Sequence, residues 1–316
     1  MTSTTSTTSA NDTAQRLFQA IRDSVADVVA VDDQVIETLI IAMFAGGHSL
    51  IEGIPGIGKT LLARTMARCV DCDFHRIQFT NDLMPSDIVG TSIWRQSHEE
   101  FTFSKGPLFS NIVLADEINR TSPRTLSCLL EAMENGTVSI DGQVTSLAEP
   151  FLVWATRNPI EFHGTYPIPE AAIDRFLVRV ELGYPRHEHE IALYQGRNPE
   201  DQLAALKPVI SRTQLIEMKQ AAQDIRISAP VATYCYRVIE ATRQHEALAL
   251  GASPRAALSL IQAAKAKAFL AGRTSVLPDD LIEMAKPVLC HRLFFKGSGE
   301  TSELVEQILA NTPVEL

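Results

Sequence analysis

Short apolar runs alternate with helix-like patterns in the first part of the chain, from Ala14 to about Tyr184. This alternation is typical of a parallel β-sheet covered by helices on both faces. Five of the runs are rich in β-branched and aromatic residues, as buried strands are. We predict strands at His48–Glu52, His75–Phe79, Asn111–Ala115, Phe151–Ala155 and Phe176–Val180.

Two further segments alternate around polar turns and predict β-hairpins that project from the sheet. One spans Trp94–Phe103, and the other spans Val138–Thr145 and carries the turn dipeptide Asp141-Gly142. An exposed aromatic side chain in the first hairpin, Trp94 or Phe101, would suit contact with a partner protein. The alternative is that these rings pack on their own core.

Beyond Pro185 the strand-like runs disappear, and Ala, Leu, Glu, Gln and Lys dominate. This pattern predicts helices at Thr213–Asp224, Pro230–His245, Pro254–Leu270 and Asp279–Leu293. The polar, Pro- and Gly-containing stretch between the two patterns marks a boundary. We therefore predict a disordered Ser/Thr-rich tail over residues 1–13, an α/β core over residues 14–190 and a small all-helical domain over residues 191–316.

Size and charge narrow the functional classes. The chain has 316 residues and a formal net charge of −10, which disfavours binding to nucleic-acid phosphates or acidic membranes. The first 13 residues lack the basic and apolar regions of a signal peptide. The most apolar run, Val35–Ala45, is too short to span a bilayer. We expect a cytoplasmic protein with no membrane insertion.

Five cysteines, an odd number, do not indicate a disulfide framework. Cys69, Cys72 and His75 have the spacing of three metal ligands, but no fourth ligand follows nearby. Core thiols and a histidine at a strand end are the favoured interpretation, and a metal site is the alternative.

The sharpest motif has the pattern G-x-x-x-x-G-K-T, between a predicted strand and a predicted helix. It consists of Gly53, Ile54, Pro55, Gly56, Ile57, Gly58, Lys59 and Thr60. Its glycines allow backbone N–H groups to surround phosphate oxygens at a helix N-terminus. In such loops the lysine reaches the β- and γ-phosphates and the threonine ligates Mg²⁺. We call residues 53–60 the phosphate loop; they predict binding of ATP with Mg²⁺.

A second motif follows the apolar strand at residues 111–115. Asp116 is placed to hold the Mg²⁺ shell, and Glu117 to polarise a water molecule toward the γ-phosphate. Acidic pairs are common on surfaces, but this one follows a buried strand about 55 residues after the phosphate loop. The pair therefore indicates hydrolysis in addition to binding.

Three polar residues have two interpretations each from sequence. Asn158 follows the next strand and either contacts the γ-phosphate and the attacking water or builds an Asn-Pro turn. Arg175 either pairs with Asp174 or projects onto the γ-phosphate of a neighbouring subunit. Arg255, in a first helical turn, either meets an anionic partner or is solvated.

Taken together, these motifs resemble those of AAA+ ATPases, and within them the MoxR family. The resemblance covers about residues 25–295 and rests on the phosphate loop and on six further segments: 116–120, 130–134, 158–161, 164–167, 174–176 and 251–256. One departure is Val31-Asp32, where the family usually has Gly-Gln near the adenine pocket.

The resemblance implies an AAA+ P-loop NTPase core with a parallel sheet and a helical lid, assembled into a hexameric ring with ATP between subunits. Asn158 then corresponds to sensor 1, Arg175 to the arginine finger acting in trans, and Arg255 to sensor 2. It also implies a partner with a von Willebrand factor A domain and a role in remodelling, maturation or metal insertion of a client protein. A nucleic-acid motor and a nucleotide-gated scaffold without hydrolysis are the alternatives.

Overall fold

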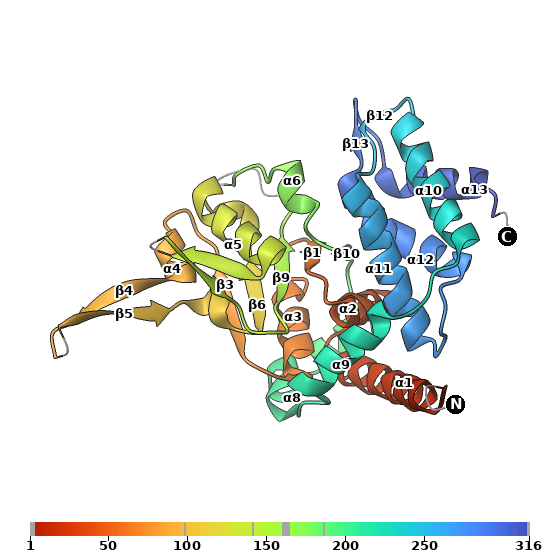
Figure 1. Cartoon of the computed structure of the whole chain (residues 1–316). Helices are drawn as coiled ribbons and strands as arrows, with labels where there is room; N and C mark the ends of the chain where they lie inside the picture. Colours follow the sequence, from red (N-terminus) through yellow and green to blue (C-terminus); the bar gives the residue numbers. More distant parts are fainter. Residues whose placement is uncertain (1–3, 98, 141, 160–164, 186, 315–316) are drawn as a thin grey trace.

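The computed structural model describes residues 4–97, 99–140, 142–159, 165–185 and 187–314. Its centre is a five-stranded sheet in which every neighbouring pair is parallel, in the order β10-β1-β9-β6-β3 (Figure 1). In chain order the strands are β1 (Ser49–Gly53), β3 (Phe74–Gln78), β6 (Ile112–Asp116), β9 (Leu152–Arg157) and β10 (Val178–Leu182). The predicted parallel α/β core is confirmed.

Each observed strand begins one or two residues away from its predicted start. At the carboxyl ends, the ladder continues into Gly53, Asp116 and Arg157, beyond the apolar runs. Backbone pairing does not require an apolar side chain, so the hydrophobic pattern underestimates how far these strands extend. The residues that follow a run are thus held by the sheet itself.

Helices cover both faces of the sheet. One face, with Ile51, Leu114 and Trp154, packs in the same core as three helices. They are α1 (Thr4–Ala26), α2 (Asp33–Ala45) and α3 (Lys59–Arg68). The other face, with Leu50 and Val153, packs with α4 (Pro85–Val89) and α5 (Pro123–Asn135).

Helix α1 differs from the prediction for the N-terminus. Residues 4–13, assigned above to a disordered tail, belong to the same helix as residues 14–26. The segment has no Gly or Pro to stop a helix, so the helix continues toward the N-terminus from the part that packs on the core. None of the described helices has the length and apolar character needed to cross a bilayer.

Both predicted hairpins are present. Strands β4 (Gly90–Arg95) and β5 (Glu100–Lys105) pair with each other, and β7 (Thr137–Ile140) pairs with β8 (Gln143–Ser146). The β4–β5 hairpin extends away from the sheet (Figure 1). The predicted turn residue Asp141 lies outside the described residues, whereas Gly142 has the left-handed φ of 79° expected in such a turn.

The segment after β10 first returns to the core. Helix α6 (Glu170–Ile173) precedes β10 along the chain, and α7 (His187–Tyr194) and α8 (Pro199–Ala205) follow it. Arg64 of α3 pairs with Glu200 of α8 at 2.7 Å. Next, β11 (Ile210–Ser211) pairs with β2 (Val70–Asp71). Helix α9 (Arg212–Gln223) shares the core cluster of α2.

The remaining chain forms a helical unit beside the sheet (Figure 1). Its helices are α10 (Ala229–Gln244), α11 (Pro254–Leu270), α12 (Pro278–Leu289) and α13 (Thr301–Asn311), with a short pair β12 (Leu248–Leu250) and β13 (Phe294–Phe295). We call residues 229–311 the lid unit. Helix α12 ends four residues earlier than predicted, and residues 290–292 form a 3-10 turn instead.

That 3-10 turn attaches the lid unit to the core. Arg292 is only 4% exposed, and its guanidinium donates to Asp174 Oδ1 at 2.8 Å, to Phe176 O at 2.7 Å and to Leu177 O at 3.2 Å. A buried arginine is stable only when its donors are satisfied. The lid unit is therefore fastened to the segment that leads into β10.

A second buried side chain, His48, ties the amino ends of the strands together. Its Nδ1 accepts from the N–H of Val153 at 3.0 Å, which leaves Nε2 to donate to Met133 O at 3.0 Å. Burial lowers the pKa of His48 from 6.5 to about 4. The folded protein thus holds the neutral imidazole at a pH where the unfolded chain binds a proton.

The titration of His48 makes stability depend on pH. As the pH falls from 6.5 to 4, the unfolded state takes up the proton first, so the free energy of unfolding should fall by up to about 3 kcal/mol through this residue. Urea denaturation across this range should show a shallower decline for His48→Gln. The exposed control His75→Gln should keep the wild-type slope, and equal slopes for all three proteins would contradict the assignment.

Candidate active site

The phosphate loop joins β1 to α3 in a conformation that depends on its glycines. Gly56 and Gly58 have left-handed φ angles of 79° and 100°. Apart from the glycine itself and its two chain neighbours, no atom of the described residues lies within 4 Å of the position that a Cβ would take at either glycine. Lys59 Nζ crosses the loop and donates to Gly53 O at 2.6 Å and Ile54 O at 2.9 Å. The loop is an open backbone cradle at a helix N-terminus and fits a phosphate chain.

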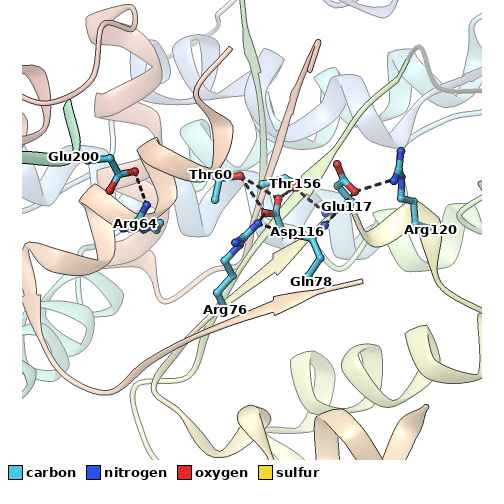
Figure 2. A network of polar contacts seen from close by, with 9 residues as sticks. All are labelled: Thr60, Arg64, Arg76, Gln78, Asp116, Glu117, Arg120, Thr156 and Glu200. Carbon is cyan, nitrogen blue, oxygen red and sulfur yellow. Dashed lines mark hydrogen bonds and ion pairs between the residues drawn. The ribbon is translucent and has the colours of Figure 1, made fainter. Parts of the chain in front are cut away.

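Asp116 is the centre of a polar network beside the loop (Figure 2). It is 4% exposed and accepts from Thr60 Oγ1 at 3.0 Å and from Arg76 Nη2 at 2.7 Å. The hydroxyl of Thr156, from β9, also donates to it. A threonine hydroxyl and a carboxylate side by side are hard oxygen donors of the kind that Mg²⁺ prefers. Thr60 and Asp116 are thus together, as expected, and fit that ion.

Glu117 follows Asp116 with an unusual backbone conformation. Its φ of 59° and ψ of 51° lie in the left-handed region, and its N–H donates to Thr156 Oγ1 at 2.9 Å. The carboxylate accepts from Gln78 Nε2 at 3.1 Å and pairs with Arg120 at 3.3 Å. Strained conformations of this kind gather at functional sites. The left-handed conformation occurs directly after Asp116, the last residue of β6 that pairs with β3.

Asn158 lies at the same edge of the sheet. It directly follows β9, which stands between β1 and β6, so it lies between the phosphate loop and Asp116. It is 4% exposed, and its carbonyl accepts from Asn119 Nδ2 at 3.4 Å. This position in the sheet order is compatible with both interpretations of Asn158 from sequence, the Asn-Pro turn and the contact with a phosphate.

A cavity of about 160 Å³ opens beside the loop. His189 of α7 contributes an Nδ1 that is buried without a hydrogen-bond partner among the described residues. An apolar slot with one unmatched polar nitrogen fits a flat heterocyclic base. Beside residues 56–58, the lining consists of Ala26, Val28, Val29, Ala30, Leu61, Pro185, His189, Leu193, Arg197 and Pro199. Asp32, noted above as a departure, caps α2 by accepting from the N–H of Gln34.

Two of the predicted site residues lie elsewhere. Arg175 precedes β10 and Arg255 begins α11, and both donate to the carboxylate of Glu134, at the end of α5. The Arg175 contact is 2.5 Å. The sequence alternative for Arg175, a pair with Asp174, is not what the structure shows, because Asp174 pairs with Arg292.

These two arginines are at the amino-terminal edge of the sheet. Glu134 is next to Met133, whose carbonyl binds His48 at the start of β1. The phosphate loop follows the other end of β1, a five-residue strand that spans roughly 15 Å. Arg175 and Arg255 are therefore together, and they are separated from the phosphate loop of the same chain.

Three members of the site were missed by the sequence interpretation: Arg76, Gln78 and Thr156. They belong to β3 and β9, and their alternation with apolar neighbours reads as ordinary strand patterning. Only the register, with Gln78 opposite Asp116, brings them to the acidic pair. Among the described residues there is no group of three or more His, Cys, Asp or Glu side chains that could hold a metal ion, and Cys69, Cys72 and His75 do not form one.

Comparison with known proteins agrees with this geometry. Residues 48–178 match a family model described as ATPase family associated with various cellular activities (AAA), and residues 240–311 match an AAA lid domain. Chaperone MoxR1 of Mycobacterium tuberculosis is 41% identical over 90% of this chain and 77% of its own length. The chain belongs to the MoxR family of AAA+ ATPases.

Two further proteins are similar to this chain over most of its length. The uncharacterized protein YeaC of Bacillus subtilis is 45% identical over 86% of this chain and 87% of its own. A crystal structure of a candidate ATPase from Cytophaga hutchinsonii superimposes with a TM-score of 0.87 and 36% identity, covering 98% of each chain. The likeness thus includes both the core and the lid unit.

Proposed function

We propose that this MoxR-family protein hydrolyses ATP and uses the cycle to remodel or mature a client protein. The observation that carries the proposal is the arrangement at the carboxyl edge of the sheet. There an open phosphate cradle follows β1, and the Glu117 carboxylate follows β6, which is separated from β1 only by β9; the Thr60–Asp116 pair bridges the two positions. This is the set of groups that phosphoryl transfer to water requires.

Each residue has a distinct role in this proposal. Bound Mg²⁺ neutralises phosphate charge, and Thr60 and Asp116 would hold it. Lys59 binds the β- and γ-phosphates, and Glu117 orients and deprotonates the attacking water. The hydrogen bond from Gln78 and the ion pair with Arg120 hold the Glu117 carboxylate in position. Asn158 completes the site by binding the water or the γ-phosphate.

The two arginines support an assembled enzyme. Because Arg175 and Arg255 are at the edge opposite the phosphate loop, they complete a site only on a second copy of the chain. A cyclic arrangement repeats this contact, as the expected hexameric ring does. Both arginines then act in trans, and an arginine supplied this way increases the rate on the order of a thousandfold or more.

The β4–β5 hairpin supports a protein client. Trp94 is 51% exposed and Phe101 is 71% exposed, and their rings meet edge to face at 5.1 Å. Arg95 lies opposite Glu100, so the positive charge at this end of the hairpin is matched by a negative one and the two residues do not form a basic surface. Exposed aromatic side chains without excess positive charge suit an apolar protein segment better than a phosphate backbone. This favours a client protein over the nucleic-acid motor.

The finer part of the proposal rests on the family resemblance. We propose a partner with a von Willebrand factor A domain and, for the client, complex assembly or metal-cofactor insertion. One relative, the MoxR1 protein, carries the name chaperone. An ATP-driven change of subunit contacts at the arginine edge would supply the motion.

Substitutions at the two ends of the site should separate binding from hydrolysis. Lys59→Ala should abolish ATP binding, measured with a fluorescent analogue, because the phosphate charge loses its partner. Glu117→Gln should bind ATP normally and lose turnover by about 10²-fold or more, measured as phosphate release. Retained turnover in Glu117→Gln would remove this residue as the base, and the scaffold alternative predicts no phosphate release from the wild type.

Assembly in trans can be tested by mixing inactive variants. Arg175→Ala should bind ATP and lose turnover on the order of a thousandfold. An equal mixture with Lys59→Ala should recover about a quarter of wild-type turnover, because one interface in four pairs an intact phosphate loop with an intact arginine. No recovery on mixing, with both variants still assembling, would contradict the trans role.

The partner can be tested with the hydrolysis-deficient chain. Glu117→Gln protein should retain a von Willebrand A-domain protein from native lysate with ATP and release it without, since the ATP-bound state lasts longest. Trp94→Ala with Phe101→Ala should lose the client and keep phosphate release. Turnover that DNA stimulates, and that salt weakens, would instead support the nucleic-acid motor.

A further inference from the structure

One carboxylate joins the core to the lid unit at the arginine edge. Glu134, the penultimate residue of α5, accepts from Arg175 Nε at 3.0 Å and from Arg175 Nη2 at 2.5 Å through Oε2. Its other oxygen, Oε1, accepts from Arg255 Nη2. Each oxygen thus serves a different arginine, and the two arginines come from different parts of the chain.

The positive and negative charges of this cluster do not cancel. Two guanidinium groups converge on a single carboxylate, which leaves one excess positive charge at this point on the edge. The two arginines lower the pKa of Glu134, Arg255 most strongly, so the carboxylate is ionised at neutral pH. Without that negative charge, the two like charges would repel each other.

The site is open to an incoming anion. The side chains of Glu134 and Arg255 are 35% and 45% exposed, and Arg175 is 22% exposed. Ion pairs of this exposure are weak and exchange readily for a stronger anion. A triphosphate carries more negative charge than one carboxylate and offers several acceptor oxygens.

We propose that Glu134 is a latch, a positioning residue that holds Arg175 and Arg255 together in the unassembled subunit and competes with the triphosphate bound to a second copy of the chain. The inference rests on the proposed trans hydrolysis and specifies how it is controlled. Glu134 does not touch the reacting atoms in this scheme. It sets how readily the two arginines are released to a neighbour.

The latch also links the lid unit to this contact. Arg255 is in the first turn of α11, whereas Arg292 keeps the lid unit attached at the start of β10. Opening of the latch releases the Arg255 side chain, while Arg292 and the contact of Ser253 Oγ with Asp174 Oδ2 at 3.4 Å keep the lid unit attached. Contact between subunits is thereby coupled to the position of the lid.

The first test measures the latch without nucleotide. Hydrogen exchange should increase in residues 170–175 and 253–258 of Glu134→Gln, because the neutral amide no longer holds both arginines. The matched control is Glu131→Gln, one turn earlier on α5, where the carboxylate accepts from Ser139 instead. It should exchange like the wild type in both segments. Unchanged exchange in Glu134→Gln overturns the latch, whatever the turnover.

The second test measures competition with the nucleotide of a neighbour. At saturating ATP, the subunit concentration for half-maximal turnover should fall about twofold to fivefold in Glu134→Gln, with the maximal rate unchanged. A purely structural role would instead lower the maximal rate and the thermal stability. If Glu134→Gln shows increased hydrogen exchange but an unchanged or higher subunit concentration for half-maximal turnover, Glu134 does not compete with the triphosphate for the two arginines.

These outcomes remain separate from the proposed function. If wild-type turnover is independent of subunit concentration, or survives Arg175→Ala, then trans hydrolysis is wrong and the competition with it. The exchange experiment still decides whether Glu134 holds the two arginines. A Glu134→Asp variant, which keeps the charge, should restore part of the exchange protection that Glu134→Gln loses.

Discussion

The pairing of β1 with strands on both sides is the constraint on which the other functional contacts depend. Its parallel neighbours β9 and β10 share its direction, so all carboxyl ends meet at one edge and all amino ends at the other. The first edge collects the phosphate loop, Asn158 and, through β6, Asp116. The amino edge carries His48 and the segment before β10, which contains Arg175. A single hydrogen-bonding pattern thus separates the binding half of the site from the arginine half.

The polar network at the carboxyl edge is possible because its buried groups satisfy one another. Asp116 is nearly inaccessible, and three donors from three different elements surround it. Thr156 is a two-way link, since its hydroxyl donates to Asp116 and accepts from the N–H of Glu117. A fully satisfied network of this kind is rigid, and it holds the neighbouring Glu117 in a backbone conformation that an isolated chain rarely adopts.

The separation of the two halves explains why assembly matters to the proposed mechanism. An arginine that cannot reach its own phosphate loop is of use only to a neighbour, so binding and catalysis become properties of an interface. The lid unit takes part because Arg292 fastens it to the segment before β10, which carries Arg175, and Arg255 meets that arginine at Glu134. The structure therefore connects the positions of two domains with the environment of one carboxylate.

By itself the sequence determined the parallel α/β class, the phosphate loop and its acidic pair, because apolar strand patterns and glycine-dependent loops are local. It left the partners of Arg175 and Arg255 open, and it passed over Arg76, Gln78 and Thr156 as ordinary strand residues. Only the tertiary structure decided these, since strand order and register bring together residues 40 positions apart along the chain. It also extended α1 through residues assigned to a tail and paired Arg175 with Glu134, because contacts between distant elements follow from packing and leave no local pattern.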